Sequence, residues 1–126
     1  MNKIRDFKDL KTWQDGHKLV IRIYKITNKF PSREDFILVS QMRKSATSFT
    51  SNIAEGFGRK TYKDKIHFYY MAQGSLIELK NQLLISKDVG YITPHVYNKL
   101  LYQADTCHKL LQSLITKSKT FLNPKS

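Results

Sequence analysis

The sequence predicts an all-α protein, folded as an antiparallel up-down-up-down four-helix bundle. Apolar residues recur at spacings of three and four along four long segments, which is the period of one face of an α-helix. The chain contains only three prolines, and they lie at or beyond the ends of these segments. No segment shows the strict alternation that is typical of a strand. Because the expected connections are short, neighbouring helices must run in opposite directions.

The first two helices are expected over residues 10–28 and 34–56. The first ends before Phe30 and Pro31, because the residue before a proline disfavours helical backbone angles. The second ends at Gly56, since glycine readily supplies the left-handed conformation that closes a helix.

The last two helices are expected over residues 62–88 and 94–116. The fourth has a clear start, because Thr93 is a good N-cap and Pro94 suits the first helical position. Residues 117–126 form a basic tail that we expect to be flexible, as chain ends without packing partners are. Residues 1–116 are therefore expected to hold the whole bundle as one domain.

Composition indicates a cytoplasmic protein with an anionic partner. The chain has 126 residues, enough for one core without disulfides or metals. Its single cysteine, Cys107, cannot form an intramolecular disulfide, which fits a reducing compartment. We expect neither a signal peptide nor a membrane span, since no long apolar run is present. The 22 Lys and Arg against 10 Asp and Glu give a formal charge of +12, which favours RNA or DNA as partner.

The first helix carries two apolar groups separated by a basic stripe. One group is expected to enter the core: Leu10, Trp13, His17, Val20, Ile21 and Tyr24. The other is expected to form the interface of a homo-oligomer, because an exposed apolar row is a liability in a monomer: Leu19, Ile23, Ile26 and Phe30. The alternative is that Phe36 and Ile37, in the following loop, fold back over this second group.

Small polar residues follow one side of the second helix and meet small residues on the third. Such residues suit a close helix contact in which polar atoms bond to one another. If the two helices turn near Arg59, Arg43 lies roughly opposite residues 75–78 and can pair with Glu78. The expected structural contact comprises Gln41, Arg43, Asn52, Glu55, Ser75 and Glu78.

We expect no enzymatic activity, no cofactor and no metal. Glu55 and Glu78 are expected at different heights of the bundle, so they cannot act as an acid/base pair. The Glu-x-x-His pair of di-iron bundles is missing. The glycines of residues 56–61 resemble a phosphate-binding loop, but Arg59 spoils the spacing and no strand precedes them.

Two basic clusters are the candidate contacts to nucleic-acid phosphates. One is the stripe on the first helix: Lys11, Lys18, Arg22, Lys25 and Lys29. The other is the turn between the second and third helices: Arg59, Lys60, Lys63 and Lys65. Each cluster could instead be an ordinary solvated face. The alternative function is an oligomeric scaffold that engages an acidic protein and ignores nucleic acid.

The run of residues 41–56, with Phe30-Pro31 before it and residues 72–78 after it, also carries a family resemblance. The chain resembles, from about Phe7 to Ile115, the four-helix-bundle proteins encoded by intervening sequences in bacterial 23S ribosomal RNA genes. These proteins are similar to the accessory variability protein of diversity-generating retroelements, a basic pentameric bundle that partners a reverse transcriptase and binds nucleic acid. The resemblance implies a homopentameric ring with affinity for RNA or DNA, and it admits a reverse transcriptase or a ribosome-associated protein as partner. No activity and no specific retroelement role follow from it.

Overall fold

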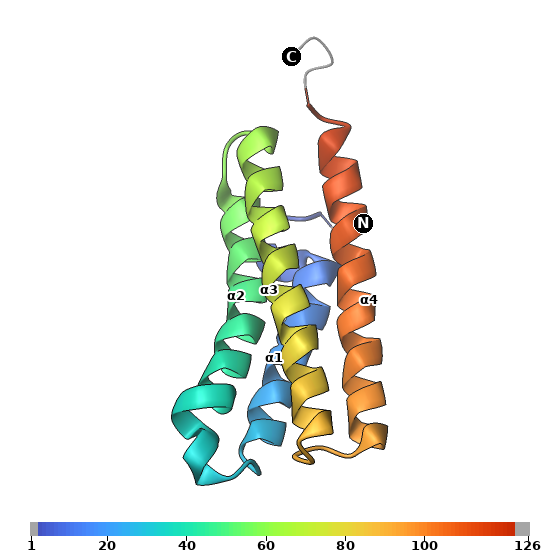
Figure 1. Ribbon diagram of the computed structural model, residues 1–126. Coiled ribbons are helices and arrows are strands. Elements are labelled where there is room, and N and C mark those ends of the chain that lie inside the picture. The colour runs from blue at the N-terminus through green and yellow to red at the C-terminus, as the bar shows by residue number, and fades with distance from the viewer. Residues whose placement is uncertain (1–2, 123–126) are drawn as a thin grey trace.

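Four long helices make up most of the chain, of which the computed structural model describes residues 3–122. They are α1 (Lys11–Thr27), α2 (Ser40–Gly58), α3 (Tyr62–Asp88) and α4 (Pro94–Lys119). Figure 1 shows α1–α2 and α3–α4 joined at one end of the bundle and α2–α3 joined at the other. The helices therefore alternate in direction, and α1 also packs on α4 to close the bundle. The predicted all-α four-helix bundle is confirmed.

Capping residues set the starts of α3 and α4. Thr61 and Thr93 each accept a hydrogen bond at Oγ1, from the backbone N–H groups of Asp64 and Val96, both at 3.1 Å. Such bonds satisfy amides that have no partner inside the helix. These caps begin α3 and α4 at the predicted positions.

Two boundaries differ from the expectation. Before α2 the chain forms a 3₁₀ turn at Ser32–Glu34 and a π-helical segment at Asp35–Val39, so the α-helix itself begins later than residue 34. At the other end α4 runs to Lys119. The first residues of the expected tail are therefore helical, and Phe121 stacks on Tyr62 with ring centroids 4.8 Å apart. Residues 123–126 of the expected tail lie outside the described residues.

All four helices contribute to one hydrophobic core. Its fully buried side chains include Phe49 and Met42 from α2, Leu79 from α3 and Leu111 from α4. The contact between α1 and α2 is close at Gly16, where an added Cβ would lie 2.7 Å from the Phe49 ring. Glycine is needed at this position because the buried ring has no room to move away.

The expected oligomer interface on α1 is wrong, because its residues belong to this core. Leu19, Ile23 and Phe30 are only 1%, 0% and 6% exposed, and Ile26 is half-buried against them. Phe36 and Ile37 do not cover them, since both are exposed. The inner face of α1 is Thr12, Gly16, Leu19, Val20, Ile23 and Thr27.

The outer side of α1 carries three residues that were expected in the core. His17, Ile21 and Tyr24 are all exposed. The helix is thus rotated about its axis relative to the expectation, and its inner face includes a glycine and two threonines. Thr27 is compatible with burial because its Oγ1 donates to the Ile23 carbonyl at 2.7 Å.

No helix within residues 3–122 is both long enough and apolar enough to cross a membrane.

Candidate nucleic-acid interface

A groove of about 840 Å³ runs between α1 and α4 on the surface of the bundle. The α1 wall is the outer side of that helix, which the rotation described above turns away from the core. The α4 wall comes from its first three turns. The lining residues are His17, Lys18, Ile21, Arg22, Lys25, His95, Asn98, Lys99, Tyr102 and Gln103.

The groove is strongly basic. Lys18, Arg22 and Lys25 from α1 face Lys99 from α4, and all four side chains are exposed. No Asp or Glu is among the residues that line it. The Arg22 Nη1 donates a hydrogen bond to the Gln103 Oε1 at 3.3 Å, which links the two walls. Hence the charges of the groove add together and are available to an anion.

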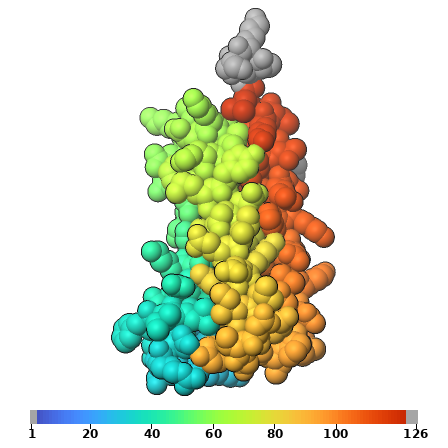
Figure 2. Space-filling view, in the orientation of Figure 1, coloured from blue at the N-terminus to red at the C-terminus, as the bar shows by residue number. Residues whose placement is uncertain are grey.

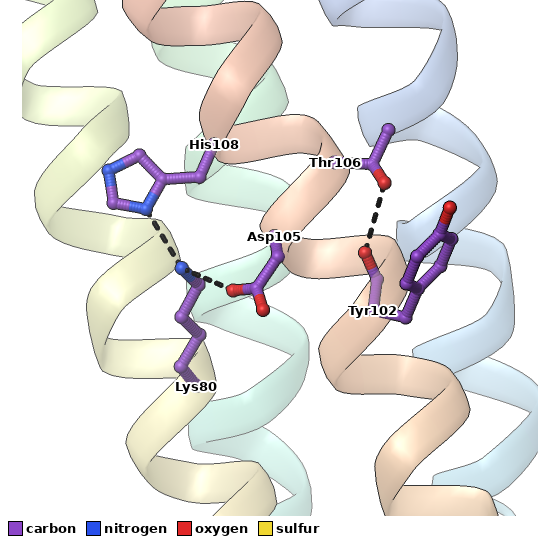
Figure 3. A network of polar contacts seen from close by, with 5 residues as sticks. All are labelled: Lys80, Tyr102, Asp105, Thr106 and His108. Carbon is purple, nitrogen blue, oxygen red and sulfur yellow. Dashed lines mark hydrogen bonds and ion pairs between the residues drawn. The ribbon is translucent and has the colours of Figure 1, made fainter.

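An aromatic side chain that the sequence analysis did not single out stands in this groove. Tyr102 is 76% exposed, and Ile21 opposite it is 43% exposed. Figure 3 shows Tyr102 projecting from α4 on the side of α1, away from the polar network on the other side of α4. The sequence does contain a signal for Tyr102, because this residue lies outside the apolar face of α4 that includes Leu100 and Leu111.

The polar network ties α4 to α3 and so fixes the α4 wall of the groove. The Lys80 Nζ lies 2.9 Å from the Asp105 carboxylate and 2.8 Å from the His108 Nδ1 (Figure 3). Burial, together with the Lys80 charge, lowers the pKa of His108 below its ordinary value. The imidazole is therefore held neutral, as an acceptor of the ammonium hydrogen.

Two members of the predicted α1 stripe lie outside the groove. Lys11 lies nearly two turns before His17, the first lining residue, and forms an ion pair with Asp15 at 3.1 Å. Lys29 follows the end of α1 and is exposed. The structure therefore narrows the stripe to its central residues.

The second basic cluster is at the other end of the bundle, at the turn between α2 and α3 (Figure 1). Arg59 is engaged locally, with Glu55 at 3.3 Å and with the Phe68 ring centroid 4.5 Å away. The Lys65 ammonium donates to the Phe57 carbonyl, and burial lowers the pKa of Lys65. Lys60 and Lys63 are exposed. The structure does not bring the two clusters together, and only part of this one is free of local structural contacts.

The small polar residues of α2 and α3 do meet. The Ser48 and Ser75 hydroxyls lie 2.9 Å apart, and the Asn52 amide donates to the Ser48 carbonyl at 2.9 Å. Gln41 and Glu78 line a shallow polar groove of about 450 Å³ beside this contact. These contacts hold α2 against α3.

The expected ion pair between Arg43 and Glu78 is wrong. Arg43 points to α1 instead, where its Nε donates to Thr27 at 3.0 Å and its Nη2 donates to Asn28 at 2.9 Å. Its guanidinium carbon also lies 4.6 Å from the Tyr24 ring centroid. Arg43 is on the side of α2 that faces α1, so it connects the first two helices rather than the second and third.

Neither a metal centre nor a reactive thiol is indicated by the geometry. Among residues 3–122, no three His, Cys, Asp or Glu side chains gather closely enough to hold a metal ion. Cys107 is buried, and that burial, with the nearby Asp15 charge, raises the pKa of its thiol to about 12.

Comparison with known proteins relates the sequence to a family and the fold to a solved structure. A crystal structure of a protein of unknown function from the S23 ribosomal protein family of Bacteroides thetaiotaomicron has a similar fold. The TM-score is 0.78 at 24% identity, over 86% of this chain and 98% of the other. No curated protein sequence matches the chain. The family model of the 23S rRNA-intervening sequence protein matches residues 8–113, and the chain therefore belongs to this family.

Proposed function

We propose that this protein is a non-enzymatic accessory protein that binds RNA or DNA in the groove between α1 and α4. The observation that carries the proposal is the lining of this groove, with four exposed cations, no carboxylate and an exposed tyrosine. Backbone phosphates supply most of the affinity of such contacts and little sequence preference. The family's name, which refers to ribosomal RNA, supports RNA as the first ligand to test.

The dimensions of the groove suit one strand. Lys18 and Lys25 are seven residues apart on α1, about 10 Å along the helix axis. That length corresponds to about three phosphates along one strand of stacked nucleotides, at the roughly 3.4 Å of axial rise that each strand has in a DNA duplex. Tyr102 offers a face on which an unpaired base can stack. We therefore propose a single-stranded segment, held by its phosphates on α1 and by one base on α4.

Fluorescence anisotropy with a labelled single-stranded RNA tests the charge contribution. We expect Lys18→Glu, Arg22→Glu, Lys25→Glu and Lys99→Glu together to abolish binding and to flatten its salt dependence. A matched control reverses four exposed lysines elsewhere: Lys8, Lys44, Lys109 and Lys117. The control changes the net charge equally, so an equal loss in both variants would assign binding to overall charge and contradict the groove.

The salt dependence gives a second measure of the same site. Neutralisation of three phosphates by the α1 side chains and of a fourth by Lys99 on α4 predicts a slope of log K against log salt of about −3 for a single strand. The alternative function is the binding of an acidic protein. In that case poly-glutamate should bind to the groove, and RNA should not bind at all. That outcome would replace nucleic acid by an acidic protein as the ligand of this groove.

Replacement of Tyr102 tests the proposed stacking separately from charge. Base stacking on an aromatic side chain contributes about 1–3 kcal/mol per base. Tyr102→Ala should weaken binding of the single strand by roughly ten- to hundredfold without changing the salt slope, and Tyr102→Phe should retain it. An equal effect on duplex RNA, which has no free base faces, would argue against stacking.

A further inference from the structure

The polar groove between α2 and α3 contains a buried hydrogen-bond acceptor for which the chain supplies no donor. Gln82 lines this groove and is only 8% exposed. Its Oε1 is buried and accepts no hydrogen bond from any of residues 3–122. Nearly all buried polar atoms have a partner, because an unsatisfied one is costly. A donor that enters the groove would satisfy this oxygen.

The groove is built from opposed residues of two antiparallel helices. The serine contact between α2 and α3 described above closes one end of it. One turn further on, Lys44 and Ser45 of α2 stand opposite Glu78 of α3. After another turn, Gln41 stands opposite Gln82. Figure 2 shows the boundary between α2 and α3 on the face toward the viewer, where no other helix covers it.

The two walls of the groove carry opposite charges that are not paired with each other. Lys44 and Glu78 are both exposed, and the four ion pairs within residues 3–122 involve neither of them. A phosphate would be repelled by Glu78, and a simple cation would be repelled by Lys44. The groove therefore complements a ligand that carries charges of both signs.

We propose that this groove binds a small zwitterion, namely an α-amino acid with a short polar side chain. The ligand's ammonium donates to the Glu78 carboxylate and to the Gln82 Oε1, because these two residues lie one turn apart on the same side of α3. The ligand's carboxylate accepts from the Lys44 ammonium and from the Ser45 hydroxyl. Each charged group of the ligand thus meets one opposite charge and one neutral partner.

The size of the groove fits such a ligand. Its volume of about 450 Å³ lies in the range of small-molecule sites, about 300–1,000 Å³. Gln41 and Ser48 are seven residues apart on α2, about 10 Å along the helix axis. The ammonium and carboxylate of an amino acid are joined through one carbon and span about 3 Å. The remaining length ends at the Gln41 amide, which can both donate to and accept from a short polar side chain.

This site is separate from the proposed nucleic-acid groove. Each helix packs on two neighbours, so the α2–α3 and α1–α4 pairs form opposite sides of the bundle. Binding in one groove can therefore be measured without the other, and the failure of either proposal leaves the other standing.

Titration with L-asparagine, followed by ¹H–¹⁵N correlation spectra of the full chain, tests the inference. We expect millimolar L-asparagine to shift the backbone amide signals of Ser45 and Glu78 and the side-chain amide signal of Gln82. Two matched ligands should each bind at least tenfold more weakly: succinamic acid lacks only the ammonium, and β-alaninamide lacks only the carboxylate. No shift at about 20 mM L-asparagine, or an equal response to either matched ligand, would overturn the proposal.

A second polar groove on the same chain is the internal control for this titration. It has a volume of about 500 Å³ and is lined by lysines, a glutamine, a serine and a threonine of α4, including Lys109 and Gln112, but by no carboxylate. The signals of these residues should stay unchanged. An equal shift in both grooves would mean that L-asparagine contacts polar surface without selection, which would contradict a site at α2–α3.

Substitutions in the groove separate a loss of binding from a loss of fold. Gln82→Met removes the buried acceptor, so it should leave the stability in urea unchanged or raise it, while L-asparagine binds at least tenfold more weakly. Glu78→Gln and Lys44→Met change exposed residues and should weaken binding by a similar factor. Lys109→Met, in the control groove, should bind as the unmodified chain does. Undiminished binding in Gln82→Met or in Glu78→Gln would overturn the proposal.

Discussion

The first and third helices are built in opposite ways. Inside, α1 uses a mixture of Gly16, threonines and aliphatic residues, whereas α3 uses a row of leucines. Outside, α1 is basic and forms a wall of a groove, whereas the exposed side of α3 between residues 70 and 85 is largely apolar and has one charged side chain, Glu78. The difference in charge makes the two outer faces suitable for different kinds of contact. A basic face suits phosphates, and a neutral apolar face suits another protein surface.

The largest effect is expected from a comparison of two isoleucines, Ile23 on the inner side of α1 and Ile77 on the outer side of α3. Ile23→Ala should destabilise the fold by about 2–5 kcal/mol, because Ile23 is completely buried. Ile77→Ala should change the stability of a single chain by less than about 0.5 kcal/mol, because Ile77 is half exposed. Urea unfolding at low micromolar concentration measures both. A similar loss of unfolding free energy in both variants would contradict the assignment of Ile23 to the core and Ile77 to the surface.

A smaller effect of opposite sign is expected at two glycines. Gly16→Ala should destabilise the fold by about 1–3 kcal/mol, since the new Cβ meets the buried Phe49 ring. Gly74→Ala should stabilise a single chain by up to about 1 kcal/mol, because it removes a helix-interior glycine without a clash. Thermal unfolding of the two variants checks the signs. A destabilised Gly74→Ala would show that the bundle itself needs this glycine.

The smallest effect is a pH dependence at the contact between α3 and α4. The pKa of His108 is lowered in the folded chain, so the unfolded chain binds a proton more readily. Stability should therefore be complete above the ordinary value of 6.5 and decline as the pH falls below it. Urea unfolding between pH 7.5 and 5.5 follows this decline. His108→Gln, which cannot be protonated, should flatten it; an unchanged slope in this variant would assign the effect to another group.

Local signals in the sequence were sufficient to predict where the helices begin. The Thr61 and Thr93 caps began α3 and α4 where expected, because capping depends on the residues within one turn. The end of α4 was placed too early, since Lys117 and Lys119 looked like a solvated tail. Ser118 is in fact buried on the inner side of the helix. A serine that bonds its own helix, here to the Leu114 carbonyl at 2.7 Å, does not mark a helix end.

The rotation of α1 could not be found in the same way. A count of large apolar residues favours the side with Trp13, Ile21 and Tyr24, but it gives no weight to Gly16 or Thr27. Those small residues face the core because α2 approaches closely there. The error about Arg43 has the same origin, since its partner depends on the rotation of α2. The groove, which needs two correctly rotated helices, could be assembled only from the structure.

The stacking of Trp13 on His17 makes Trp13 an intrinsic fluorescence probe of the groove. Trp13 is the only tryptophan, and its ring lies 4.7 Å from the His17 ring and nearly parallel to it. His17 in turn lines the groove between α1 and α4. A base that enters beside His17 changes the environment of the indole, so intrinsic emission follows occupancy in unlabelled protein. Emission of the α3 variants should remain that of the unmodified chain, because their substitutions lie on another face of the bundle.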